Sequence, residues 1–165
     1  MIHLRTQSAD ETLRLGERIG RLLARGAVVG LDGDLGTGKT WMAKGLVRGI
    51  GAFDEELVKS PAYNLVHEYA VARDGGVLPV VHIDFYRLAE LSVTDRLLFE
   101  EYFGHRDRIV LVEWAGRFLA DLAPSYLAIE LGLCADGDPD CREIAIGAAG
   151  DPARYELVLR ELAAS

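Results

Sequence analysis

The chain has 165 residues, half of them hydrophobic, which is enough to bury the core of one domain spanning 1–165. Eighteen basic residues against 26 acidic ones give a formal net charge of −8. This balance argues against sequence-independent binding to nucleic acid or anionic lipid, which requires clustered lysines and arginines. No window approaches the roughly 18 apolar residues of a membrane helix, and no signal peptide is visible, so we expect a cytoplasmic protein without a membrane role.

The first third of the chain predicts a helix, a strand and a second helix. Ser8 and Glu11 have the spacing of a helix capping box, and the apolar residues after them repeat at helical spacing until Gly26, which suits a helix end. The apolar run 27–32 predicts a buried strand. After a glycine-rich segment, the apolar spacing of 42–50 predicts a helix.

The rest of the chain predicts more strands than helices. An Asp74-Gly75 pair between two apolar runs favours a hairpin. Strands are expected at 64–71, 77–85, 109–113, 126–133 and 142–146, and helices at 92–102 and after Asp151. Together these elements predict an α/β sandwich. Its mixed sheet should be flanked by helices, parallel near the glycine-rich segment and antiparallel at one side.

The glycine-rich segment matches the phosphate-binding pattern G-x-x-x-x-G-K-[ST] at every fixed position. It consists of Gly33-Asp34-Leu35-Gly36-Thr37-Gly38-Lys39-Thr40. Glycines let successive backbone N–H groups point into one concavity, and the following helix N-terminus adds positive potential. Lys39 would reach the β- and γ-phosphates, and the Thr40 hydroxyl would be a ligand of Mg²⁺. The pattern therefore predicts a P-loop NTPase domain that binds ATP with Mg²⁺.

Trp41 follows the loop directly, where many P-loops carry a second small hydroxyl residue. Its ring could pack in the core or flank the nucleotide. We include it among the candidate nucleotide-binding residues.

Two predicted strands end on an acidic residue. Asp84 closes the apolar run 80–83, and Glu113 closes the run 109–112. P-loop enzymes need a carboxylate at such a strand end to organise the metal or its water. The sequence leaves open which of the two acids serves Mg²⁺ and which orients the attacking water.

Four ordered segments of the chain resemble the TsaE family, small bacterial ATPases of tRNA threonylcarbamoyladenosine synthesis. They are 33–40, 59–66, 82–88 and 111–114. The last three contain Ser60-Pro61-Ala62-Tyr63, Asp84-Phe85-Tyr86-Arg87 and Val112-Glu113-Trp114, which are more specific than a P-loop alone. The resemblance implies an accessory protein that binds and slowly hydrolyses ATP. It would act with TsaB and TsaD, whose heterodimer modifies the adenosine beside the anticodon, and would meet tRNA only through that complex.

The resemblance also implies residue roles. Asp84 and Glu113 would be the catalytic acids, with Thr40 and Glu113 at the metal. The residues expected at the nucleotide outside the phosphate loop are Trp41, Ser60, Tyr63, Arg87 and Trp114, with 60–63 acting as a loop that senses the γ-phosphate. Alternatively, Ser60-Pro61 is a plain turn, Tyr86 belongs to the core and Arg87 is a solvated strand end.

One departure from the family pattern concerns catalytic rate. The family usually has threonine where this chain has Ala62, so a hydroxyl that could contact Mg²⁺, its water or the γ-phosphate is missing. Together with Trp41, this predicts that nucleotide binding survives and that turnover by the isolated protein is low.

Alternative functions are a small-molecule P-loop kinase, a GTPase and a nucleotide-gated scaffold without catalysis. No arginine-rich lid supports a kinase, and no Asn-Lys-x-Asp segment supports a GTPase. Two further patterns receive structural interpretations. We expect Cys134 and Cys141 to remain reduced in a cytoplasm, although a hairpin would allow a disulfide. His67 and His82 are taken as structural or surface residues.

Overall fold

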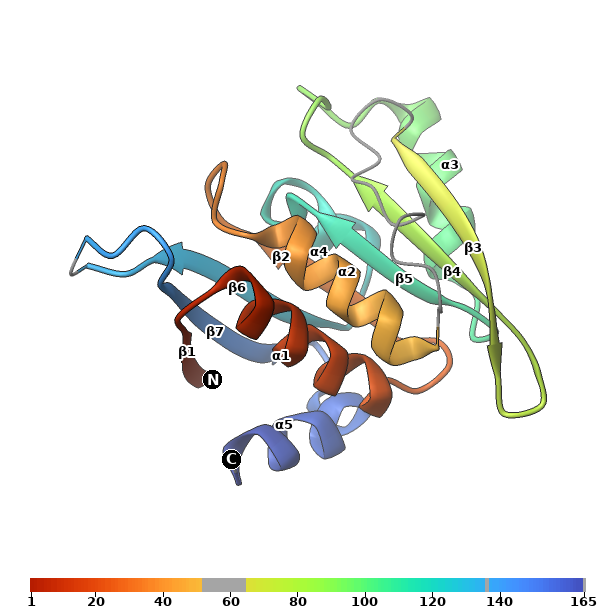
Figure 1. Cartoon of the computed structure of the whole chain (residues 1–165). Helices are drawn as coiled ribbons and strands as arrows, with labels where there is room; N and C mark the ends of the chain where they lie inside the picture. Colours follow the sequence, from red (N-terminus) through yellow and green to blue (C-terminus); the bar gives the residue numbers. More distant parts are fainter. Residues whose placement is uncertain (52–64, 136, 165) are drawn as a thin grey trace.

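The computed structural model describes residues 1–51, 65–135 and 137–164. Its centre is a seven-stranded sheet in the order β1-β7-β6-β2-β5-β4-β3 (Figure 1). The strands are β1 (Ile2–Thr6), β2 (Val28–Asp32), β3 (Val66–Arg73), β4 (Gly76–Asp84), β5 (Ile109–Glu113), β6 (Tyr126–Leu133) and β7 (Arg142–Ala149).

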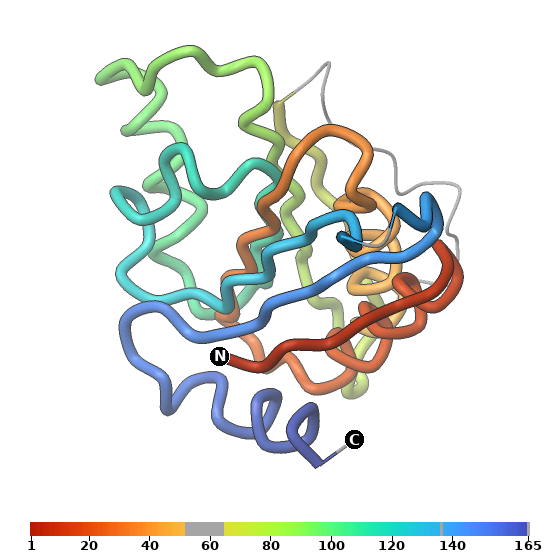
Figure 2. The backbone as a smooth tube through the Cα atoms, turned by 90° about the vertical axis from the view of Figure 1, so that its left-hand side faces the viewer, coloured from red at the N-terminus to blue at the C-terminus, as the bar shows by residue number. Residues whose placement is uncertain are grey.

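Parallel and antiparallel pairing occupy different parts of this sheet. The four central strands β6, β2, β5 and β4 run parallel to one another. Antiparallel neighbours flank them on both sides, with β7 and β1 at one edge and β3 at the other. The sheet is therefore mixed, as expected, and the antiparallel pairing predicted at one side is present at both edges. Strand β1 had not been predicted, and it forms the edge beside β7 (Figure 2).

Helices cover both faces of the sheet. On one face lie α1 (Ala9–Leu22), α2 (Lys39–Ile50) and α5 (Glu156–Ala163), whose apolar residues pack into one core cluster with the strands (Figure 1). On the other face, α3 (Val93–Phe103), α4 (Leu119–Leu122) and the short helix η2 (Ala115–Arg117) pack on a second cluster. A further short helix, η3 (Pro152–Tyr155), precedes α5. This confirms the predicted α/β class.

The helix ends follow the predicted chemistry in part. The Ser8 hydroxyl accepts the Glu11 N–H, but the Glu11 carboxylate accepts from the Gln7 N–H instead of completing the capping box on Ser8. A complete capping box is present at Ser92 and Asp95, where α3 begins. Helix α1 ends at Leu22, earlier than a stop at Gly26 would give.

Close packing of α1 on α2 fixes the helix that carries Lys39. A Cβ at Gly45 would lie 2.1 Å from the Leu13 carbonyl oxygen, and one at Gly20 would lie 2.2 Å from that of Leu46. Only glycine permits two helix backbones to approach this closely. Within the described residues, no helix is long and apolar enough to span a bilayer.

Candidate nucleotide site

The phosphate loop lies between the end of β2 and the start of α2, at the carboxyl edge of the parallel strands. Residues 33–38 join Asp32 to Lys39, and Gly33, Gly36 and Gly38 have φ values of 130°, 83° and 101°. Residues that carry a side chain rarely adopt such backbone dihedrals. At Gly33 a Cβ would also lie 2.1 Å from the carbonyl oxygen of Leu131. The glycines of the pattern are therefore required by the backbone path itself.

Lys39 is the first residue of α2, and its side chain reaches back to the start of the loop. Its side chain is 5% exposed, and Nζ donates to the carbonyl oxygens of Gly33 and Asp34 at 2.7 Å each. The ammonium also lies 4.0 Å from the centre of the Trp114 ring. Burial lowers the pKa of Lys39 below its ordinary value, although the charges of Glu113, Asp32, Asp84 and Asp34 act in the opposite direction.

The two acidic strand ends lie side by side. Asp84 and Glu113 are register partners on β4 and β5, and each is 2% exposed. The Thr40 hydroxyl lies 3.3 Å from Oε2 of Glu113, which places the candidate metal ligands together. Asp84 Oδ1 accepts the Tyr86 N–H at 2.8 Å. The structure thus brings both predicted acids to the P-loop but gives them different partners.

His82 belongs to this site, although the sequence had assigned it a structural or surface position. It is fully buried, and Nε2 lies 3.0 Å from Oε1 of Glu113. An ionised carboxylate only accepts hydrogen bonds, so the imidazole N–H is the donor in that state. The clue was available, because His82 precedes Asp84 by two residues on a strand and so shares its face.

A pocket of about 370 Å³ opens above these groups. It is lined by Leu35, Gly36, Gly38, Lys39, Thr40, Trp41, Asp84, Tyr86, Glu113 and Trp114. Trp41 is 44% exposed and borders the pocket, so its packing in the core is excluded. The alternative that placed Tyr86 in the core is wrong, because Tyr86 is 43% exposed and its ring lies 5.0 Å from that of Trp114. Three aromatic residues, Trp41, Tyr86 and Trp114, therefore line the pocket.

Other candidate residues lie outside the lining of this pocket. Gly33 and Asp34 contribute the carbonyl oxygens that accept from Lys39, and Thr37 is buried with its hydroxyl on the Asp34 carbonyl. Arg87 is exposed and does not line the pocket. Ser60 and Tyr63 lie outside the described residues.

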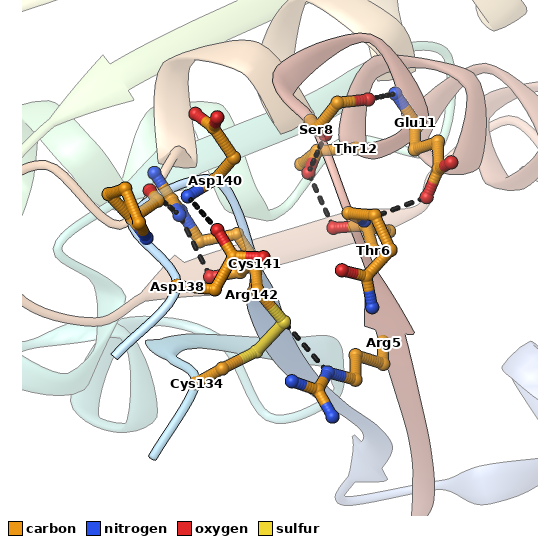
Figure 3. The surroundings of a disulfide bond; sticks show 12 residues. Arg5, Thr6, Ser8, Glu11, Thr12, Cys134, Asp138, Asp140, Cys141 and Arg142 are labelled. Atoms are coloured by element: carbon orange, nitrogen blue, oxygen red, sulfur yellow. Dashed lines mark hydrogen bonds between the residues drawn. A yellow bond between two sulfur atoms is a disulfide. The ribbon is translucent and has the colours of Figure 1, made fainter. Parts of the chain in front are cut away.

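Arg142, which sequence reasoning missed, donates hydrogen bonds to the backbone of the phosphate loop. Arg142 of β7 donates from Nε to the Thr37 carbonyl at 2.9 Å and from Nη2 to the Gly36 carbonyl at 3.4 Å. It follows Cys141, which forms a disulfide with Cys134 and accepts a hydrogen bond from Arg5 (Figure 3). The expectation of reduced cysteines was wrong. The strand pair β6–β7 sets the two Cα atoms 5.5 Å apart, within bonding range.

The oxygen groups of the pocket suit Mg²⁺ bound together with a phosphate. Among the residues that the structure describes, no three His, Cys, Asp or Glu side chains are grouped as a metal cage. Mg²⁺ does not need such a cage in nucleotide sites, where waters and phosphate oxygens complete its octahedron. Thr40 and Glu113 offer two hard oxygen donors beside the loop. The donor set therefore fits the expected ion.

A larger hollow, of about 470 Å³, lies elsewhere, over β1, β6 and β7. Its lining includes His3, Arg5, Glu130 and Glu143 but no residue of the phosphate loop. We therefore base the candidate site on the smaller pocket, where a lysine, a hydroxyl and two carboxylates meet at a glycine loop.

The chain is similar to known proteins in sequence and in fold. Residues 6–142 match the family model described as threonylcarbamoyl adenosine biosynthesis protein TsaE. A tRNA threonylcarbamoyladenosine biosynthesis protein TsaE from Bacillus subtilis is 36% identical, covering 96% of this chain and 91% of its own length. The protein of the same name from Treponema pallidum is also 36% identical, over 86% of this chain and 96% of its own. The crystal structure of Bacillus subtilis YdiB superposes with a TM-score of 0.71 at 31% identity, covering 99% of this chain and 94% of that one.

Proposed function

The chain belongs to the TsaE family of threonylcarbamoyladenosine biosynthesis proteins, and we propose that it serves there as a slow, partner-dependent ATPase. In this proposal ATP binds with Mg²⁺ at the phosphate loop. The protein acts with homologues of TsaB and TsaD, and tRNA is met only through their complex.

One observation carries the proposal. Lys39, Thr40, Asp84 and Glu113 line one pocket, although they come from three separate segments of the chain. The segments are neighbours because β2, β5 and β4 are adjacent parallel strands, so their carboxyl ends meet at one edge. This edge is where open α/β sheets bind ligands.

The phosphate chemistry follows from the groups at the loop. Lys39 Nζ is held by two backbone carbonyls, so an incoming phosphate exchanges neutral oxygens for charged ones and strengthens the lysine's hydrogen bonds. The N-terminus of α2 adds positive potential at the same point. When bound, Mg²⁺ neutralises charge on the phosphate oxygens. Glu113 and Asp84 supply the two carboxylates that the metal and the attacking water require.

Slow turnover has a physical basis in the same site. Before nucleotide binds, Glu113 is occupied by Thr40 and His82, and Asp84 by the Tyr86 N–H. A residue engaged in this way is available as a general base only after its partners rearrange. With Ala62 in place of the usual threonine, a hydroxyl is also missing. We propose that the partner proteins supply this rearrangement.

The test combines binding, hydrolysis and association. ATP affinity and phosphate release should be measured with and without TsaB and TsaD homologues, using Lys39→Ala and, as a matched control from the same helix, Lys44→Ala. Lys44 lies over the Trp41 ring and does not line the pocket. We expect the isolated protein to release phosphate slowly and the TsaB and TsaD homologues to stimulate this release. Lys39→Ala should lose both the slow release and the stimulation, whereas Lys44→Ala should keep them.

Three results would overturn parts of the proposal. Brisk hydrolysis by the isolated protein would contradict partner dependence. Failure to associate with the pair under every nucleotide condition would contradict the assembly. Transfer of the γ-phosphate to a small molecule instead of water would favour the kinase alternative.

A further inference from the structure

Arg142 donates to two backbone carbonyls of the phosphate loop from a distant part of the chain. It begins β7, where it is the register partner of Leu133 on β6. Its guanidinium donates to two carbonyls of its own hairpin, those of Pro139 and Cys141, at 2.7 and 2.8 Å. Its remaining donors reach Thr37 and Gly36 of the loop, 105 and 106 residues away in sequence. The side chain thus joins the hairpin to the loop.

The two loop carbonyls are significant because a peptide group is planar. In a trans peptide the C=O of one residue points opposite to the N–H of the next. Arg142 holds the Thr37 carbonyl pointing toward its own guanidinium, so the Gly38 N–H points in the opposite direction, away from Arg142. The Thr37 N–H is already used, since it donates to the Asp34 carbonyl within the loop.

The glycines make this external support necessary. Gly36 and Gly38 both have positive φ, and a glycine at such a position populates other dihedrals at little cost. No neighbouring atom lies within 4 Å of where a Gly36 Cβ would stand, so packing does not restrict this part of the loop. The hydrogen bonds from Arg142 to the Gly36 and Thr37 carbonyls restrain it from outside the loop.

Arg142 is itself well anchored. Cys141, the residue before it, is fully buried and bridged to Cys134, and the Arg5 Nε donates to its sulfur at 2.7 Å (Figure 3). Two of the guanidinium's bonds go to the hairpin backbone, so the side chain has a fixed geometry from which to hold the loop. A planar guanidinium serves four carbonyls at once, which a lysine ammonium with three donors cannot do.

We propose that Arg142 is a positioning residue for phosphate binding. It orients the peptide groups of the phosphate loop so that the Gly38 N–H points toward the phosphates before nucleotide arrives. This inference rests on the proposed nucleotide function and deepens it. Arg142 touches the loop's carbonyls and none of the reacting atoms, so its effect must appear in how strongly phosphates are recognised.

The experiment compares Arg142→Ala and Arg142→Lys with Arg154→Ala in the full-length protein. Arg154 is a matched control because it also donates to a glycine carbonyl, that of Gly26 at 2.6 Å, in a different loop. Affinities for ATP and AMP are measured by calorimetry in Mg²⁺. We expect Arg142→Ala to weaken ATP binding about tenfold, as loss of charge-assisted hydrogen bonds implies. AMP binding should change much less, with Arg142→Lys intermediate and Arg154→Ala retaining the parent preference for ATP.

A second readout needs no nucleotide. Amide ¹⁵N relaxation of Thr37 and Gly38 should show greater mobility in Arg142→Ala than in the parent or in Arg154→Ala. Unchanged mobility, or an equal loss of ATP and AMP affinity, would overturn the positioning role. If the parent protein fails to bind ATP, the proposed function fails, while the relaxation data still decide whether Arg142 orders the loop.

Discussion

Asp84 at the end of β4 and Glu113 at the end of β5 are register partners with equal burial, yet their carboxylates contact different parts of the molecule. Glu113 reaches inward to Thr40 and His82. Asp84 accepts a hydrogen bond from the N–H of Tyr86, two residues later in the sequence. A place at the sheet edge therefore brings an acid to the site, and its bonding partners determine what it can do there.

The different partners suggest a division of labour. Glu113 shares a hydrogen bond with the hydroxyl expected to bind Mg²⁺, so we assign it to the metal. Asp84 fixes the turn that carries Tyr86. The Tyr86 ring lies against the Trp114 ring, and the Trp114 ring in turn lies over the Lys39 ammonium. By this account Asp84 shapes the rim of the pocket and supports catalysis, whereas Glu113 is essential for it.

The largest expected effect comes from Glu113→Gln, which keeps the size of the side chain and removes its charge. We expect ATP hydrolysis in the partner complex to fall about 100-fold, the scale seen when one charge-stabilising group of an active site is lost. Asp84→Asn retains an oxygen that can accept the Tyr86 N–H, so its loss should stay within about tenfold. Steady-state phosphate release measures both. A greater loss in Asp84→Asn would reverse the assignment.

A smaller effect is expected at the rim that Asp84 supports. Trp114→Leu removes the ring that lies over the Lys39 ammonium and against Tyr86. A partly buried cation–π contact contributes about 1 kcal/mol, so ATP affinity should fall roughly fivefold. Trp41 also lines the pocket, but its ring contacts Lys44 instead, so Trp41→Leu is the control and should cost less. An equal loss of ATP affinity in the two variants would show that the contact between Lys39 and Trp114 makes no specific contribution to binding.

The pH dependence of ATP binding tests the charge of Lys39, on which both Glu113 and Asp84 act. Burial lowers the Lys39 pKa below 10.5, so the ammonium is fully charged at lower pH and loses its proton as the pH rises through that lowered value. As the pH is raised, ATP affinity should therefore begin to fall before the pH reaches 10.5, the ordinary pKa of a lysine. Because phosphate favours the charged form, binding in that range should take up protons. Calorimetry in buffers of different ionisation enthalpy measures the uptake, and Lys39→Arg should abolish it.

A change at the distant hairpin should affect stability and leave the contrast between the two acids untouched. Replacing Cys134 and Cys141 together by serine removes a crosslink with a sequence separation of 7. We expect a loss of about 2 kcal/mol in the free energy of unfolding, from loop-closure entropy. Chemical denaturation of oxidised parent and double variant measures it. Free-thiol titration of the folded parent provides the check, since two reactive thiols would contradict the disulfide.

The parts of the molecule that sequence could predict depend on local patterns. The phosphate loop is a contiguous motif, and each acid closes its own apolar run, so Lys39, Thr40, Asp84 and Glu113 were identified before the fold was known. Their convergence required only that neighbouring strands be parallel. Most strand and helix positions followed from apolar periodicity for the same reason.

The parts that sequence missed depend on contacts between distant segments. Strand β1 is five residues long and is fixed by pairing with β7 at the other end of the chain. Arg142 reaches a loop 105 residues away, and no local pattern marks it. The disulfide was missed for another reason. The hairpin geometry was anticipated, and the assumption of a reducing compartment outweighed it.

Magnesium dependence of ATP binding tests the account's central claim most directly, namely that Glu113 and not Asp84 serves the metal. Calorimetric titration with and without Mg²⁺ should be made on the parent, Glu113→Gln and Asp84→Asn. We predict that Mg²⁺ tightens ATP binding in the parent and in Asp84→Asn, and that this gain is lost in Glu113→Gln. A gain lost in Asp84→Asn but kept in Glu113→Gln would contradict the account, as would a parent protein whose ATP affinity does not depend on Mg²⁺.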